Sequence, residues 1–132
     1  MGGPLVAGPY LLDTSTLIWA VAAPDRLSAA ARKAIKAGPL VLSVVSYWEI
    51  VIKARKGLLT VSDPAGWWSR AADLLGGEIL SIRATHISAL AALPEIHRDP
   101  FDRMLIAQAA AEGLTLMAKD AVLHPYAVKV LW

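Results

Sequence analysis

The sequence predicts an α/β protein, a three-layer α/β/α sandwich with a central parallel sheet. Short apolar runs of strand length alternate along the chain with longer segments of helical spacing. This alternation is typical of parallel sheets with helices on both faces. The connections between the segments are short, which favours right-handed crossovers. We expect a single domain over residues 1–132, with residues 1–9 as a poorly ordered N-terminal extension.

The first strand is expected at Tyr10–Leu12, an apolar run that ends at an acidic residue. Residues 14–21 follow with apolar side chains at helical spacing, and residues 28–36 form a second, Ala- and Lys-rich helix that a Gly-Pro pair stops. Residues 40–45 are apolar and β-branched, which predicts a buried strand.

A helix is then expected at residues 46–56, because Ser46 and Glu49 have the spacing of a capping box. A Ser-Asp-Pro sequence opens the next helix at residues 62–75, and two glycines end it. A strand at 78–82 and a helix at 85–93 follow.

The strongest helical segment of the chain is residues 99–111, where Asp99 and Pro100 mark the beginning and Gly113 marks the end. Strands at 114–118 and 128–131 complete the expected sheet.

Composition excludes several classes of protein. The chain has no cysteine, which excludes a disulfide scaffold, a thiolate metal site and a cysteine nucleophile. It is 56% hydrophobic and 18% charged, which excludes intrinsic disorder. The uncharged stretches at 14–24 and 37–48 are shorter than the ~20 apolar residues of a membrane span. We expect no signal peptide and a cytoplasmic location. The net charge of +2 permits nucleic-acid binding without demanding it.

Acidic residues gather where a parallel sheet binds ligands, at the carboxyl ends of strands and the N-termini of helices. They are Asp13, Glu49, Asp99, Asp102 and Asp120. Carboxylates within about 5 Å of one another repel by ~3 kcal/mol per pair at an effective dielectric constant of about 20. Such a cluster must hold a proton or bind a cation. Oxygen ligands suit Mg²⁺ or Mn²⁺, which activates water and neutralises phosphoryl oxygens, as phosphodiester hydrolysis requires.

Most of these acids also have a structural interpretation. Glu49 fits the capping box, Asp99 fits a helix N-cap before proline, and Asp102 suits the first turn of a helix. Asp120 fits a turn or an N-cap, whereas Asp13 has the weakest structural explanation.

Other conspicuous residues favour structural roles. The histidines, His86, His97 and His124, lack ligand spacing and are expected to be surface or satisfied residues. The pair Trp67 and Trp68 is expected to pack one ring inside and to place the other on an exposed face or at an interface, rather than to stack on bases. Basic clusters at 32–36 and 53–56 fit either a nucleic-acid groove or a solvated helix face.

Four segments together resemble a PIN domain, and among PIN domains the VapC-type toxin ribonucleases of toxin–antitoxin pairs. They are LLDTSTLIW (11–19), SVVSYWEIVIKARKGLL (43–59), HRDPFDRMLIAQAAAEGLTLMAKD (97–120) and YAVKVLW (126–132). The resemblance covers residues 10–132 and implies a compact α/β/α sandwich with Mg²⁺- or Mn²⁺-dependent ribonuclease activity.

The resemblance also implies roles for residues and partners. It places the family's catalytic, metal-binding acids on Asp13, Glu49, Asp102 and Asp120, with Asp99 as an additional acid or N-cap. Ala118 stands where the family often has Ser or Thr, so a water, Thr14 or Ser15 would have to supply that hydroxyl contact. Family toxins are normally dimers and are silenced by an antitoxin that covers the site.

The sequence is therefore interpreted as a metal-dependent endoribonuclease, in which in-line attack by water would leave a 5′-phosphate and a 3′-hydroxyl. The helices expected at 46–56 and 62–75 would form a groove for an amphipathic antitoxin helix. Two alternatives stay open, a receiver-like Mg²⁺-binding phosphotransfer domain and a non-catalytic binding module of the same fold. A test of metal dependence on mixed RNA separates the three.

Overall fold

The computed structural model describes residues 7–95, 99–119 and 128–132. Its five-stranded sheet is parallel throughout, with the strand order β3-β2-β1-β4-β5. The strands are β1 (Tyr10–Leu12), β2 (Leu40–Ser43), β3 (Glu78–Leu80), β4 (Thr115–Met117) and β5 (Val130–Leu131). The helices are α1 (Thr14–Ala22), α2 (Ala29–Ala37), α3 (Val44–Arg55), α4 (Pro64–Leu75), α5 (Ala84–Ala92) and α6 (Pro100–Glu112), with a 3₁₀ turn, η1, at Pro24–Arg26.

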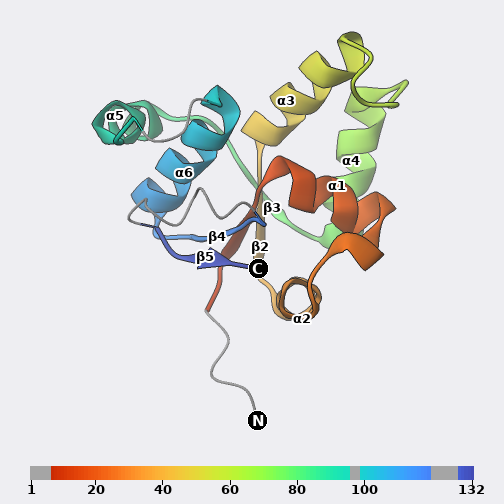
Figure 1. Cartoon of the computed structure of the whole chain (residues 1–132), viewed down its shortest axis with the longest axis horizontal. Helices are drawn as coiled ribbons and strands as arrows, with labels where there is room; N and C mark the ends of the chain where they lie inside the picture. Colours follow the sequence, from red (N-terminus) through yellow and green to blue (C-terminus); the bar gives the residue numbers. More distant parts are fainter. Residues whose placement is uncertain (1–6, 96–98, 120–127) are drawn as a thin grey trace.

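Helices cover both faces of the sheet, which confirms the predicted three-layer α/β/α architecture. Figure 1 shows α5 and α6 on one side of the strands and α1, α2 and α4 on the other. Alternate residues of β1 separate the two cores: Leu12 packs with α1 and α2, whereas Leu11 packs with α6. Both leucines are fully buried, as expected for a central strand that has helices on both faces.

The strand predicted at 40–45 ends earlier than expected. Ser43 closes β2, and Val44 and Val45 begin α3 instead of extending the strand. The Ser43 hydroxyl accepts a hydrogen bond from the Val45 N–H at 3.1 Å, so Ser43 is the N-cap of α3. Val45 is fully buried in the core beside α6, and this packing outweighs the β-propensity of a valine pair.

β1 has its predicted bounds, whereas β3, β4 and β5 are shorter than predicted, and the helices lie within a few residues of their predicted bounds. Residues 7–9 are hydrogen-bonded to β4. The Thr115 hydroxyl donates to the Ala7 carbonyl at 2.7 Å, and the Thr115 N–H donates to the Pro9 carbonyl at 3.1 Å. None of the helices in the described ranges is long and apolar enough to span a membrane.

A buried polar network connects α6 to the beginning of α3. The Ser43 hydroxyl donates to Oε1 of the fully buried Gln108 at 2.5 Å, and Gln108 Nε2 donates to the Ser81 carbonyl at 3.3 Å. Gln108 also lies 3.3 Å from Nδ1 of His86, whose Nε2 contacts Glu112 at 3.0 Å. His86 is thus a buried, satisfied histidine, as predicted, while His97 and His124 lie outside the described residues.

We expect Gln108→Met to lower the free energy of unfolding by about 1–3 kcal/mol, because it leaves the buried Ser43 hydroxyl without its acceptor. A double-mutant cycle with Ser43→Ala, followed by chemical denaturation, measures the pair. The double variant should be more stable than the sum of the single losses implies, by at least about 0.5 kcal/mol. Additive losses would show that the two side chains do not interact.

Candidate active site

Asp13 stands at the carboxyl end of the central strand. Its N–H donates to the Met117 carbonyl at 3.1 Å, which fixes it beside the end of β4. Its Oδ1 accepts from the Thr16 N–H at 2.8 Å, so Asp13 is the N-cap of α1. The sequence interpretation missed this capping role, although an acid followed by Thr-Ser-Thr is a capping signal.

Asp99 and Asp102 lie at the N-terminus of α6. Asp99 Oδ1 accepts from the N–H groups of Phe101 (2.9 Å) and Asp102 (3.0 Å), so Asp99 is the predicted N-cap. Asp102 is therefore in the first turn, where the helix dipole favours a negative charge without requiring the side chain to cap. Asp99 therefore caps the helix, whereas Asp102 is not needed as a cap.

Glu49 does not form the predicted capping box with Ser46. Since α3 begins at Val44, both residues lie inside the helix, and the prediction failed because it placed the helix start too late. Glu49 is only 4% exposed. The Thr14 hydroxyl lies 2.6 Å from Glu49 Oε1 and 3.0 Å from Ser46 Oγ, while Lys53 Nζ lies 2.5 Å from Glu49 Oε2.

These side chains surround a pocket of about 260 Å³ at the carboxyl edge of the sheet. It is lined by Asp13, Thr14, Ser15, Trp19, Glu49, Lys53, Asp99, Asp102 and Lys119. The structure thus brings together Asp13, Glu49, Asp99 and Asp102, as the sequence predicted; Asp120 lies outside the described residues. The sequence interpretation did not place Trp19, Lys53 or Lys119 in the pocket. Only Lys53 carried a signal, its i, i+4 spacing from Glu49.

The pocket is electrostatically crowded. Burial, reinforced by the charges of Asp102 and Glu49, raises the pKa of Asp13 from 3.8 to about 6, against the lowering effect of the Thr16 hydrogen bonds. The Glu49 carboxylate raises the pKa of Lys53, and the charges of Asp99 and Asp102 add to this effect. Lys53 therefore stays charged and offsets part of the repulsion among the acids.

The donor set has the chemistry of a site for a hard divalent cation, since it offers carboxylate oxygens and no sulfur. Within the described ranges, no three Asp, Glu or His side chains are arranged to hold one ion together. The Glu49 carboxylate is contacted by Lys53 and Thr14. Mg²⁺ usually keeps several waters and binds through one or two carboxylates plus substrate phosphates. Burial, together with the neighbouring charge of Asp102, raises the pKa of Asp13, so a cation beside this carboxylate would favour its ionised form. Asp13 and Asp102 fit such an ion.

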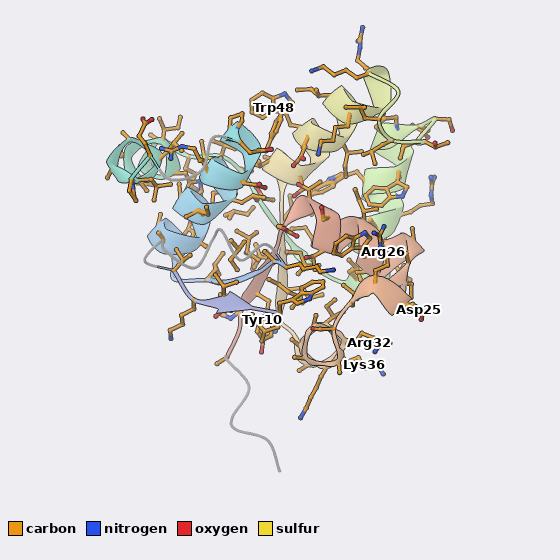
Figure 2. All side chains as sticks on the ribbon, viewed as in Figure 1. Tyr10, Asp25, Arg26, Arg32, Lys36 and Trp48 are labelled. Atoms are coloured by element: carbon orange, nitrogen blue, oxygen red, sulfur yellow. The ribbon has the colours of Figure 1, made fainter. Side chains whose placement is uncertain are left out.

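The aromatic residues around the site pack against one another. Tyr47 of α3 and Trp68 of α4 stack with their ring centroids 5.2 Å apart. The groove expected between these helices remains a prediction. Trp67 and Trp68 are both half-buried against the core, so the rings do not divide into one that is inside and one that is exposed. Trp48 is 53% exposed, lies between α3 and α6 in Figure 2, and meets the Phe101 ring edge-on at 4.9 Å.

Comparison with known proteins identifies the family. A profile of the PIN domain matches residues 10–129. The chain belongs to the PIN domain family. It is 32% identical over 128 residues to ribonuclease VapC22 of Mycobacterium tuberculosis, an alignment that covers 91% of this chain and 96% of that protein. This relative confirms the resemblance to VapC-type proteins that the sequence motifs carry, and the receiver-like alternative is excluded.

Solved structures share the fold at low sequence identity. The VapBC2 complex of Rickettsia felis bound to a promoter DNA fragment aligns with a TM-score of 0.69 and 15% identity, over 92% of this chain and 96% of that one. The FitAcB structure from Neisseria gonorrhoeae aligns with a TM-score of 0.64 and 16% sequence identity. A toxin–antitoxin complex from Klebsiella pneumoniae aligns with a TM-score of 0.62 and 20% sequence identity. Each alignment covers 93% of this chain and 96% of the other chain.

The raised pKa of Asp13 predicts how stability depends on pH in the absence of divalent ions. Between about pH 4 and 6 the folded chain holds a proton that the unfolded chain releases, so Asp13 makes stability fall as the pH rises through this window. Asp13→Asn removes this penalty and can still cap α1. In EDTA at about pH 7.5 the variant should be more stable by on the order of 1–3 kcal/mol.

Thermal or chemical unfolding over a pH series checks this prediction, and the gain should vanish below about pH 4. Asp73→Asn, at an exposed aspartate of α4, is the matched control and should change little. A gain that is independent of pH, or a loss of stability at neutral pH, would contradict the assignment.

Proposed function

We propose that the chain is a metal-dependent endoribonuclease and the toxin of a toxin–antitoxin pair. The observation that carries this proposal is the pocket in which Asp13, Glu49 and Asp102 meet at the carboxyl edge of a PIN-domain sheet. The 32% identity to a VapC ribonuclease supports RNA as the substrate.

Mg²⁺ or Mn²⁺ would be held by Asp13 and Asp102, with Asp120 as a third ligand and Glu49 as a ligand or as a group that positions water. Such an ion supplies charge neutralisation at phosphoryl oxygens and lowers the pKa of water. The cytoplasmic location expected from the sequence remains a prediction, and it agrees with an RNA substrate.

The residues of the chain have separate tasks in this reaction. Asp99 fixes the first turn of α6 and thereby aims Asp102 at the pocket. Thr14 and Lys53 each contact one oxygen of the Glu49 carboxylate and so fix its orientation. Lys53 also brings a positive charge to the acids, and a phosphodiester that enters the pocket meets that ammonium group.

The purified chain should cleave mixed single-stranded RNA with Mg²⁺ or Mn²⁺ and stop in EDTA. Asp102→Asn should lower the cleavage rate by about 100-fold or more, the scale of loss when one charge-stabilising group is removed. Asp99→Asn should keep a good part of the activity, because asparagine also caps helices. The rates are measured on a labelled oligonucleotide together with the melting temperature of each variant.

Asp99→Asn is the matched control for Asp102→Asn, since each variant removes one negative charge from the same end of α6. Full activity in EDTA would contradict the metal requirement. An inactive Asp99→Asn beside a normal Asp102→Asn would show that the ligand is the other acid.

An antitoxin partner is proposed from the toxin–antitoxin complexes that share the fold and from the exposed Trp48 ring, which meets the half-buried Phe101 ring. Each of these rings is next in sequence to a pocket acid, Glu49 or Asp102. A partner that covers them would also cover the opening of the pocket. The homodimer implied by the resemblance remains a prediction.

Expression of the chain alone should arrest bacterial growth, and co-expression of the adjacent small gene should relieve the arrest. The Asp102→Asn variant, expressed to the same level, should be harmless. Growth counts and RNA integrity on gels measure both effects. A wild-type chain that is harmless in cells but cleaves RNA in vitro would remove the toxin assignment and leave the nuclease assignment intact.

A further inference from the structure

Trp19 connects the acidic pocket to a basic surface. It lies on α1, lines the pocket and is half-buried against the core. The Trp132 ring meets it at a centroid distance of 5.7 Å and an interplanar angle of 62°, which fixes its orientation. An indole held in this way is a rigid support for whatever lies on its face.

Two cations lie on that support. The guanidinium carbon of Arg26, at the end of η1, is 4.9 Å from the centroid of Trp19, and Lys119 Nζ is 6.0 Å from it. Both side chains are exposed. In the described part of the chain, neither forms an ion pair with a carboxylate. We call Trp19, Arg26 and Lys119 the basic ledge. Figure 2 shows Arg26 beside α1, with Arg32 and Lys36 farther along on α2.

The position of the basic ledge suggests its ligand. Lys119 lines the same pocket as Asp13 and Asp102, so the ledge borders the carboxylates directly. A guanidinium that lies on an indole keeps its N–H donors free at its edge, and this fork matches two oxygens of a phosphate. Because the cation covers the ring, that face of Trp19 is not available for stacking on a base.

We propose that the basic ledge binds a backbone phosphate of single-stranded RNA next to the scissile phosphodiester, with Arg26 as the principal contact and Trp19 as its positioning residue. This inference rests on the proposed ribonuclease function. RNA that enters the pocket carries its neighbouring phosphates past a group of carboxylates that repel them. Cations at the border of the pocket offset this repulsion and fix which phosphodiester reaches the acids.

The test is binding of a fluorescein-labelled single-stranded RNA of about twelve nucleotides, a length within the usual range of binding sites. Fluorescence anisotropy is measured in the cleavage-deficient Asp102→Asn chain with Mg²⁺, over a salt series from about 50 to 200 mM. Arg26→Ala should weaken binding about tenfold and reduce the slope of log K against log salt by about 0.7, the value for one phosphate contact on a single strand.

Further variants separate charge from geometry. Arg26→Lys should keep the salt slope but bind more weakly, because lysine keeps the charge and loses the fork. Trp19→Leu should weaken binding without removing a charge, and Trp19→Phe should restore it. Arg70→Ala, at an exposed arginine of α4 that does not line the pocket, is the matched control and should change neither quantity. Melting temperatures show which variants are folded.

The outcomes distinguish this inference from the function on which it rests. If Arg26→Ala binds with the affinity and slope of its parent while the wild-type chain cleaves RNA, the basic ledge does not bind RNA and remains available to carboxylates of a protein partner. If the parent chain does not bind RNA at all, both proposals fail. If RNA binding depends on Arg26 but no RNA is cleaved, the ledge is supported and the nuclease assignment is wrong.

Discussion

Repulsion among the carboxylates at one edge of the sheet is the constraint that the surrounding structure has to meet. Asp13 and Asp99 are N-caps, whose carboxylates are stabilised by backbone N–H donors. The donor distance is 2.8 Å for Asp13, and the two distances for Asp99 are 2.9 and 3.0 Å. Asp102 lies in the first turn of α6, where the helix dipole favours a negative charge. Glu49 is not stabilised by a helix N-terminus, because it lies in the second turn of α3. It depends instead on Lys53 at 2.5 Å and on the Thr14 hydroxyl at 2.6 Å.

The topology of the sheet determines which acids meet. Since β1 pairs in parallel with both β2 and β4, the residues that follow these three strands emerge at the same edge. Asp13 follows β1, and α3, which carries Glu49, follows β2. The Ser43–Gln108 hydrogen bond then joins the start of α3 to α6 and so fixes Asp102 relative to Glu49. A buried polar contact remote from the pocket thereby helps to determine its geometry.

The sequence predicted the order of the elements, the parallel sheet and the meeting of Asp13, Glu49, Asp99 and Asp102, because these follow from apolar periodicity and from strand ends. It did not predict where α3 begins. The two valines after Ser43 have strand propensity, and it is the burial of Val45 against α6 that makes them the start of the helix. The capping box of Ser46 and Glu49 failed for a related reason, since it depended on the same helix start. Trp19, Arg26 and Lys119 come from separate segments, and no local pattern connects them.

The distribution of charge around the pocket couples cation binding to RNA binding. Among the described residues, four carboxylates and two ammonium groups line it, so it has a formal excess of negative charge, which increases when Asp13 ionises above about pH 6. A phosphodiester approaching this surface is repelled until positive charge enters. In the proposed function, a divalent ion at Asp13 and Asp102 would supply that charge, and a bound phosphate would in turn supply oxygen ligands to the ion. Each would then strengthen the binding of the other by the same factor. The basic ledge differs from the ion in that Arg26 and Lys119 belong to the chain and lie near the Trp19 ring. It gives the RNA a fixed attachment while the occupancy of the pocket changes.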